Sequence, residues 1–464
     1  MKFFKRALSI ILVVALVAGG ICLADKVTER TVSRQKYIKF FSEQKEYDVL
    51  FYGSSHVLSG LQPMEIWDKY GITSYNLAGH AASLGMSYWV LRESLRYHKP
   101  KLAVLDIYDM YAFDQPYMDV SFMHYSLDAY PLDRLKFEAV RDLLKGRSTG
   151  EKTELLFPFS VYHSRWNEVT EQSLKESFSD DYFNPYYGSE ARYGVAVPMD
   201  IDRVPAQDVT EGSGGADNYI RGFVKICEDA GVQVCFMRVP YPASVENQCA
   251  ENRAMKLAEE LGIEVIDMMC DVEGASEKLS STVVDWDTDL VDPNAHLNAY
   301  GAYKVSLFLG EWLKRVYGFT DKREDPDYAN WKEDFEKVYL PALNIDLKLQ
   351  SDFKTCLMLS AYPEYETELQ VTSLFEADEV CEKLIKEHGD LITIGTFRET
   401  NCEDGDEASD SFTLEPGQTA CCFDLDGQTL GTEPDASTLT TPVARILVKL
   451  RDTGEVVADK VFLQ

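Results

Sequence analysis

Positive charge is scarce in this chain. Its 464 residues include 46 Lys or Arg against 77 Asp or Glu, which gives a formal net charge of −31. A surface this acidic repels polyanions, and this excludes a nucleic-acid backbone or an anionic lipid surface as a general partner. Apolar residues make up 45% of the chain and aromatic residues 12%. This content is ample for packed cores, so a disordered chain is excluded as well.

Metal-ligand spacing is also absent. The chain has ten cysteines, but no CxxC pair and no Cys/His cluster with the spacing of a zinc site. Cys227, Cys235 and Cys270 fall in apolar runs that look like core, and Cys421 and Cys422 are adjacent. We therefore expect buried free thiols and no disulfide framework.

The amino terminus combines a few basic residues with a long apolar run. Lys2, Lys5 and Arg6 precede a long apolar stretch at residues 7–24, close in length to the ~18–20 residues that span a bilayer. We expect residues 1–25 to be a signal anchor with its amino terminus in the cytoplasm, which places the rest of the chain outside. A cleaved signal peptide is the alternative, because the run ends in a loose small-residue cleavage pattern.

Short apolar runs alternate with helical stretches through residues 26–318, which predicts βαβ units, a parallel sheet and the α/β class. We expect strands at residues 49–52, 72–77, 102–107, 232–239 and 264–268. Apolar positions with helical spacing predict helices at residues 85–98, 225–230, 252–261 and 300–316. Gly231 is placed to end one of these helices.

A long insertion at residues 111–216 separates the third and fourth strands. It has little periodicity except at residues 132–144. Long excursions at the carboxyl edge of a parallel sheet often build substrate pockets. A string of aromatic and polar residues within it contains His163 and Arg165, a combination that suits contact with a sugar ring or a carboxylate of the substrate. The alternative is a hydrophobic plug with an exposed charge.

The carboxyl-terminal part changes in character. Residues 319–345 predict a linker helix that packs through Trp331 and Phe335. From residue 346 to the end there are nine Lys/Arg and 25 Asp/Glu, so 9 − 25 = −16, about half of the net charge. Strand-like runs surround one helical segment at residues 377–387. We expect residues 346–464 to form a small acidic α+β accessory domain without a catalytic motif.

Two short polar strings carry the residue types of acyl chemistry. The first, Gly-Ser-Ser-His at residues 53–56, ends an apolar run and precedes a candidate helix. The second, at residues 292–298, holds Asp292 and His296 in one loop before another helix. A serine hydroxyl becomes a nucleophile when an imidazole takes its proton, and a carboxylate orients that imidazole. We therefore expect Ser55 as nucleophile, His296 as general base and Asp292 as the orienting acid.

An oxyanion hole needs hydrogen-bond donors near the nucleophile. The backbone N–H of Ser55 is one candidate. The N–H of Gly79, in the loop after the second strand, is the other. His56 directly follows the nucleophile and either caps the helix or contacts substrate, and His80 adjoins Gly79.

These strings resemble the SGNH/GDSL hydrolase superfamily over about residues 46–340. The similarity is closest to a membrane-anchored branch with Gly-Ser-Ser-His in its first block. That branch includes proteins similar to DltD, the D-alanyl-lipoteichoic acid transfer protein, and to the alginate O-acetylation proteins. The resemblance implies a three-layer α/β/α, flavodoxin-like sandwich, with Ser55 as nucleophile, His296 as base and Gly79 in the oxyanion hole.

Two positions depart from the superfamily pattern. The acid normally lies three residues before the histidine, where this chain has Pro293. Asp292 lies four residues before the histidine, and Asp289 is therefore a rival for the role. The third-block asparagine has no match in residues 105–109, so one oxyanion donor is missing from the pattern. Its absence would weaken turnover or tune the site for transfer.

The resemblance implies an extracytoplasmic, membrane-anchored serine esterase or O-acyltransferase. Its substrate would be a cell-envelope polysaccharide or a teichoic-acid-like polymer, and its intermediate an acyl-serine. Members of the branch often work beside a membrane-bound O-acyltransferase, which is the expected protein partner. The alternative is a catalytically silent scaffold of a membrane-bound O-acylation complex. We expect no metal or organic cofactor, because a Ser/His/Asp relay needs neither.

Overall fold

The computed structural model describes most of the chain between residues 23 and 339. Within that range it leaves out residues 30, 109–118, 193–195, 197, 211–213, 270–277, 287–288 and 294. Before it, only isolated positions are described, and after it only Ala342 and eight strands between residues 347 and 463. No helix in these described parts is long and apolar enough to cross a membrane. The predicted anchor at residues 1–25 lies largely outside them.

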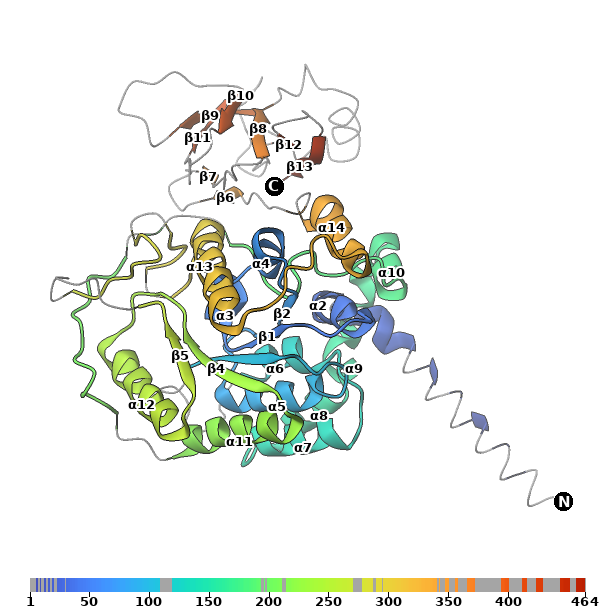
Figure 1. The fold of residues 1–464 in the computed structure, drawn as a ribbon. Coiled ribbons are helices and arrows are strands. Elements are labelled where there is room, and N and C mark those ends of the chain that lie inside the picture. The colour runs from blue at the N-terminus through green and yellow to red at the C-terminus, as the bar shows by residue number, and fades with distance from the viewer. Residues whose placement is uncertain are drawn as a thin grey trace.

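Five parallel strands form the central sheet, in the order β2-β1-β3-β4-β5 (Figure 1). They are β1 (Val49–Tyr52), β2 (Ser74–Asn76), β3 (Leu102–Asp106), β4 (Gln233–Arg238) and β5 (Glu264–Asp267). Each strand lies inside the stretch that the sequence predicts for it. This is the flavodoxin-like strand order, and it confirms the predicted α/β class.

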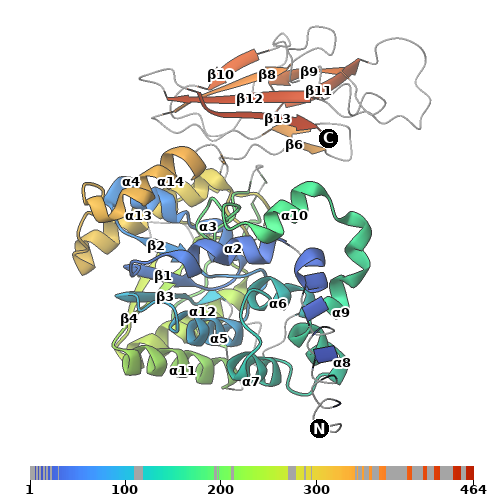
Figure 2. The ribbon, with the colours of Figure 1, turned by 90° about the vertical axis from the view of Figure 1, so that its right-hand side faces the viewer.

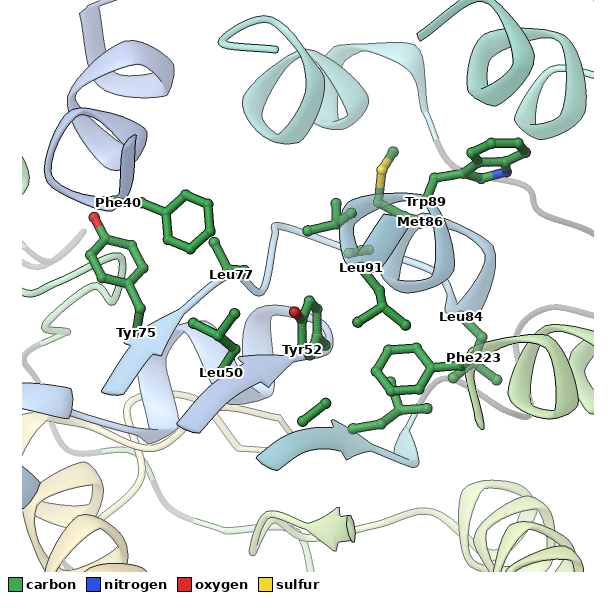
Figure 3. Packing of buried hydrophobic residues seen from close by; sticks show 14 of the residues in the cluster. Phe40, Leu50, Tyr52, Tyr75, Leu77, Leu84, Met86, Trp89, Leu91 and Phe223 are labelled. Carbon is green, nitrogen blue, oxygen red and sulfur yellow. The ribbon is translucent and has the colours of Figure 1, made fainter. Parts of the chain in front are cut away.

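Helices cover both faces of the sheet (Figures 1 and 2). On one face lie α3 (Ser55–Gly60), α4 (Pro63–Tyr70) and α13 (Ala299–Tyr317), and on the other lie α5 (Leu84–Ser94), α11 (Gly215–Ala230) and α12 (Val245–Leu261). Side chains of a strand alternate between the two faces. Val49 and Phe51 therefore pack with one helical layer, and Leu50 and Tyr52 pack with the other. Figure 3 shows Leu50 and Tyr52 in the second of these cores.

Local sequence signals explain several element ends. The sequence predicts Gly231 as the end of a helix, and the structure confirms it. Gly231 follows α11 at φ 68°, and its N–H donates to the Cys227 carbonyl.

Cys227 and Cys235 are free and buried, as predicted, and Cys249 is free and half-buried. Burial raises the pKa of the Cys227 thiol to about 12, so this thiol is unreactive at neutral pH.

The insertion is more helical than its sequence indicates. It contains α6 (Val120–Leu127), α7 (Arg134–Leu143), α8 (Thr149–Leu156), α9 (Phe159–Tyr162) and α10 (Glu171–Phe178), besides the 3-10 turn His163–Glu168. The sequence predicts only the region of α7. The other helices are short, and side-chain caps start several of them. The Ser148 and Glu151 side chains close a capping box at α8, for example.

Residues near 330 join the main core. Trp331, in α14 (Ala329–Asp334), is 1% exposed, and Phe335 is 6% exposed. Both were predicted to pack, and both belong to the cluster that contains α2 (Thr31–Ser42), including its Tyr37 and Phe40. The indole of Trp331 lies against the rings of Trp67 and Tyr187. This segment is therefore part of the packed core beside the sheet.

The strands described after residue 345 pair among themselves. They are β6 (Leu347–Leu349), β7 (Thr355–Leu357), β8 (Tyr365–Val371), β9 (Ile394–Glu399), β10 (Ser411–Leu414), β11 (Phe423–Gln428), β12 (Val443–Leu450) and β13 (Val456–Leu463). The order β10-β8-β12-β13 makes one antiparallel sheet, and β11-β9 and β6-β7 make two antiparallel pairs. The helix predicted at residues 377–387 lies outside the described residues.

Candidate active site

A tight turn presents Ser55 at the carboxyl end of β1. β1 pairs with β2 on one side and with β3 on the other, so Ser55 lies at the point where the strand order reverses, the usual ligand position in such sheets. Gly53 makes the turn. A Cβ there would lie 2.6 Å from Cγ2 of Val57 and 2.7 Å from Cβ of Asp106. Ser54 caps α3 by accepting a hydrogen bond from the His56 N–H at 3.3 Å, and Ser55 is the first helical residue.

A closed loop brings Asp292 and His296 together. Leu290 and Leu297 form an antiparallel bridge, and the Val291 N–H donates to the His296 carbonyl at 3.0 Å. Oδ1 of Asp292 accepts the N–H of Ala295 at 2.7 Å and of His296 at 3.1 Å. The four-residue spacing is therefore accommodated by one compact turn that the Asp292 carboxylate itself organises.

The relay expected from the sequence is connected by hydrogen bonds. Nδ1 of His296 lies 2.5 Å from Oδ2 of Asp292, and Nε2 of His296 lies 2.7 Å from Oγ of Ser55. When Nδ1–H donates to the carboxylate, Nε2 is free to accept the Ser55 O–H. Burial alone would raise the pKa of the Asp292 carboxyl, but hydrogen bonds from His296 and two backbone N–H groups lower it to about 2. The carboxylate is therefore ionised at neutral pH, as a partner for an imidazolium must be.

Asp289, the rival acid, has a different partner. Its carboxylate accepts two bonds from Nζ of Lys304, at 2.8 and 3.0 Å, and the N–H of Asp285 at 2.7 Å. Its side chain is fully buried. Asp289 therefore fastens the loop, and Asp292 is the carboxylate bonded to His296.

The two predicted oxyanion donors differ in the structure. The Gly79 N–H donates to the Gly53 carbonyl at 3.1 Å, so it is already used to hold the nucleophile turn. This departs from the role predicted for Gly79. The Ser55 N–H has no acceptor among the described residues. Ser55 N–H is therefore the predicted donor that remains available to an oxyanion.

His56 is buried behind the relay and does not face solvent. It is 2% exposed. Its ring stacks on Tyr108 at 3.6 Å, meets Tyr241 edge-on at 4.5 Å and lies 5.3 Å from the His296 ring. Burial and the nearby His296 lower the pKa of His56 well below its usual value. A neutral, enclosed His56 supports the wall of the site, which differs from the substrate contact that the sequence suggested.

His163 and Arg165 are held elsewhere. Nδ1 of His163 bonds the Ser160 carbonyl at 3.0 Å within its own helical segment. Arg165 donates to the Thr28 carbonyl at 3.2 Å. Figures 1 and 2 both draw α9, which ends at this segment, well apart from α3. The structure therefore does not bring this predicted pair of substrate contacts to Ser55.

The end of the insertion reaches the site edge instead. The Glu190 N–H donates to the Leu58 carbonyl of α3 at 2.9 Å, and the Arg192 carbonyl accepts the Ala299 N–H of α13 at 2.7 Å. Glu190 also pairs with Nε2 of His80 at 2.8 Å. Sequence patterns gave no signal for Glu190 or Arg192, because both lie in an irregular segment that only tertiary contacts place here.

Among the described residues, no group of three or more His, Cys, Asp or Glu side chains is arranged to hold a metal ion. Oγ of Ser55 is bonded to the relay through Nε2 of His296, and His80 and Glu190 pair with each other. The arrangement suits deprotonation of a hydroxyl and attack on a carbonyl carbon.

Gly53→Ala is expected to destabilise the fold, because the new methyl group would press on Val57 and Asp106 in a packed region. We expect the free energy of unfolding to fall by about 1–3 kcal/mol, measured by urea denaturation. Gly150→Ala is the matched control. Gly150 lies in α8, and a Cβ there would meet Oγ of Ser148 at 3.7 Å, an ordinary van der Waals distance. Alanine there should therefore be neutral or stabilising by about 0.5–1 kcal/mol. Equal effects of the two substitutions would contradict the packing described for Gly53.

Several solved structures resemble this chain, and the two described below do so at low similarity. No family model and no curated protein matches the chain. A candidate acylhydrolase of Bacteroides fragilis NCTC 9343 is 10% identical at a TM-score of 0.30, over 62% of this chain and 99% of that one. A candidate platelet activating factor of Streptococcus pneumonia is 12% identical at a TM-score of 0.30, over 65% and 99%. At these values neither similarity carries a functional conclusion.

Proposed function

We propose that this protein is a serine esterase or O-acyltransferase that works through an acyl-Ser55 intermediate. The observation that carries the proposal is the 2.7 Å contact between Nε2 of His296 and Oγ of Ser55, in a relay completed by Asp292. The three residues come from a turn and a loop about 240 positions apart in the chain. Their convergence at the carboxyl edge of the sheet is the arrangement that hydroxyl activation needs.

In the first half-reaction His296 takes the proton of Ser55 while Oγ attacks the carbonyl carbon of an ester. Negative charge develops on the carbonyl oxygen, and the Ser55 N–H is the available backbone donor for it. His296 then gives its proton to the departing alkoxide, and the C–O bond to the alcohol breaks. Asp292 stabilises the imidazolium throughout, because its carboxylate is ionised and bonded to Nδ1.

In the second half-reaction His296 takes a proton from water or from an acceptor hydroxyl, and that oxygen attacks the acyl carbon. The proton returns to Oγ of Ser55 as the acyl–serine bond breaks. Water yields a carboxylic acid and defines an esterase. An acceptor hydroxyl yields a new ester and defines a transferase.

The proposed place of this reaction is the cell envelope. The basic residues and the apolar run at residues 1–25 support a membrane anchor with the catalytic part outside. The resemblance to membrane-anchored SGNH proteins supports a polysaccharide or a teichoic-acid-like polymer as substrate and a membrane-bound O-acyltransferase as partner.

The choice between hydrolysis and transfer is tested by adding an acceptor. The full chain in detergent is mixed with p-nitrophenyl acetate, with and without an envelope glycan. If the protein is a transferase, we expect the glycan to speed deacylation and to gain acetyl esters, detected by mass spectrometry. Release of acetate at the same rate in both mixtures, with no acetylated glycan, would contradict transfer and leave the esterase.

A silent scaffold of an O-acylation complex is the second candidate. The Gly79 N–H is engaged with the Gly53 carbonyl, and the third-block asparagine is absent. The oxyanion hole is therefore short of donors, which favours this alternative. A scaffold would show no burst of p-nitrophenol from p-nitrophenyl acetate, and a fluorophosphonate would leave no adduct on its Ser55.

A further inference from the structure

Lys36 is a buried amine whose hydrogen bonds lead toward the nucleophile turn. It lies on α2 and is fully buried. Its Nζ donates to the Ala78 carbonyl at 2.6 Å and to the Gly188 carbonyl at 2.7 Å. Burial, opposed in part by Glu190, lowers the pKa of Lys36 to about 7. An amine removed from water at this cost needs hydrogen-bond partners, and these two carbonyls provide them.

The two carbonyls belong to two segments that contact the nucleophile turn or the helix after it. One is the loop after β2 that contains Ala78 and Gly79, and the other is the turn that contains Gly188 and Glu190. Ala78 precedes Gly79, whose N–H donates to the Gly53 carbonyl at 3.1 Å. A short path of bonded backbone therefore leads from Nζ of Lys36 to the residue that makes the turn before Ser55.

The second segment, which contains Gly188, lies against the end of β2. The Tyr187 carbonyl accepts the Asn76 N–H at 3.0 Å. Gly188 has φ 87°, and a Cβ there would fall 2.1 Å from the Asn76 carbonyl oxygen. Only glycine permits this close approach, so the turn is tightly fitted against the loop that carries Gly79.

Side chains of the two segments also contact each other, and Tyr125 of α6 contacts both Lys36 and Glu190. The ring of Tyr125 lies 5.1 Å from Nζ of Lys36, and its hydroxyl donates to Oε1 of Glu190 at 3.0 Å. Glu190 pairs with His80, two residues after Ala78. Burial alone would raise the pKa of Glu190, but the bond with His80 and the charge of Lys36 help to lower it overall. Lys36 is thus bonded to both segments at the centre of this cluster.

We propose that Lys36 is a positioning residue for Ser55, because its Nζ clamps the Ala78 and Gly188 carbonyls and so fixes the loop that braces the nucleophile turn. The proposal rests on the proposed function of Ser55. Lys36 touches no reacting atom. His296 and Asp292 lie in a separate loop, and the described bonds of the Lys36 ammonium go to the Ala78 and Gly188 carbonyls instead. The hydrogen bond between His296 and Asp292 should therefore survive loss of the clamp.

The test compares Lys36→Met with Lys39→Met in the full chain in detergent. Methionine fills similar space but donates no hydrogen bond, so both carbonyls lose their donor. Displacement of a catalytic group by about 1 Å can cost on the order of 10²-fold. We expect Lys36→Met to lower the maximal rate of Ser55 labelling by a fluorophosphonate about 10- to 100-fold per folded molecule, with the half-saturating probe concentration nearly unchanged.

Lys39 is the matched control on the same helix. It forms an ion pair with Asp334 and lies over the rings of Phe183 and Tyr187. Among the described contacts, the bonds to the Ala78 and Gly188 carbonyls belong to Lys36 and not to Lys39. Lys39→Met should lower thermal stability but label at the wild-type rate. A wild-type rate for Lys36→Met, or the same loss in both variants, would overturn the proposal.

If Lys36→Met does not fold, Lys36→Gln is the second variant that tests the proposal. Its side chain is one bond shorter, so its amide reaches one carbonyl at most, and we expect an intermediate rate. A wild-type labelling rate for Lys36→Gln would contradict the clamp. Absence of labelling in the wild-type protein would instead overturn the proposed function, and the premise of this proposal with it.

Discussion

Ser55→Ala is expected to abolish covalent labelling and to lower hydrolysis of an activated ester about 10⁴- to 10⁶-fold, as loss of a serine nucleophile does in related relays. The reason is that Oγ is the only atom bonded to Nε2 of His296 within the described relay. The measurement is kcat/KM for p-nitrophenyl acetate, together with fluorophosphonate labelling of both proteins.

Ser54→Ala is the neighbouring control for this prediction. Ser54 caps α3 through the His56 N–H, so its loss should cost about 0.5–2 kcal/mol of stability. It should leave labelling within about tenfold of wild type, because Ser55 keeps its bond to His296. If Ser54→Ala lost labelling and Ser55→Ala kept it, the nucleophile would be misassigned.

Asp292→Asn and Asp289→Asn are expected to have different effects: the first should lower kcat, and the second should lower stability. Asparagine at 292 stabilises an imidazolium poorly and can leave His296 in the wrong tautomer, so kcat should fall about 10⁴-fold, the size of this effect in serine relays. Asp289→Asn removes the charge that pairs with Lys304. It should reduce stability and keep kcat per folded molecule near wild type. The check is kcat with the folded fraction measured on the same samples by near-UV circular dichroism.

The opposite order of effects would assign the relay to Asp289. Equal and large losses of kcat in both variants would mean that the loop collapses without either carboxylate. The first result would contradict the hydrogen bond described between Asp292 and His296. The second would contradict the purely structural role assigned to Asp289.

The sheet could be predicted because β1, β2 and β3 are buried along their whole length, on both faces. Residues 49–52 form a continuous apolar run, and such a run marks a strand covered by helices on either side. The relay could be predicted because each of its parts lies in a short polar turn or loop next to an apolar strand or helix. Asp292 and His296 share one loop, and Ser55 follows a strand whose end must lie at the same edge.

Other features depend on contacts that local patterns do not encode. Lys36 lies in an ordinary helical segment, and nothing in that segment shows that its Nζ meets the carbonyl of residue 78. The engagement of the Gly79 N–H was missed for a similar reason. A glycine after a strand marks a loop. The direction of the Gly79 N–H, however, depends on the position of the Gly53 carbonyl, which lies at the end of β1 on the neighbouring strand.

The insertion shows the same limit on a larger scale. Its helices are short, and their stability comes from caps and packing more than from apolar periodicity. The aromatic and basic string around His163 and Arg165 looked like a binding site because of its composition. In the fold Arg165 bonds the Thr28 carbonyl and His163 bonds the Ser160 carbonyl, while Glu190 and Arg192 lie at the site edge.

Peptide mapping of the wild-type protein after brief treatment with a fluorophosphonate tests the central claim most directly. Mass spectrometry should find one phosphonyl adduct per chain, on Ser55, and prior denaturation should prevent it because the contact with His296 is then lost. An adduct on Ser54 or another residue, or no adduct on folded protein, would contradict an acyl-enzyme at Ser55.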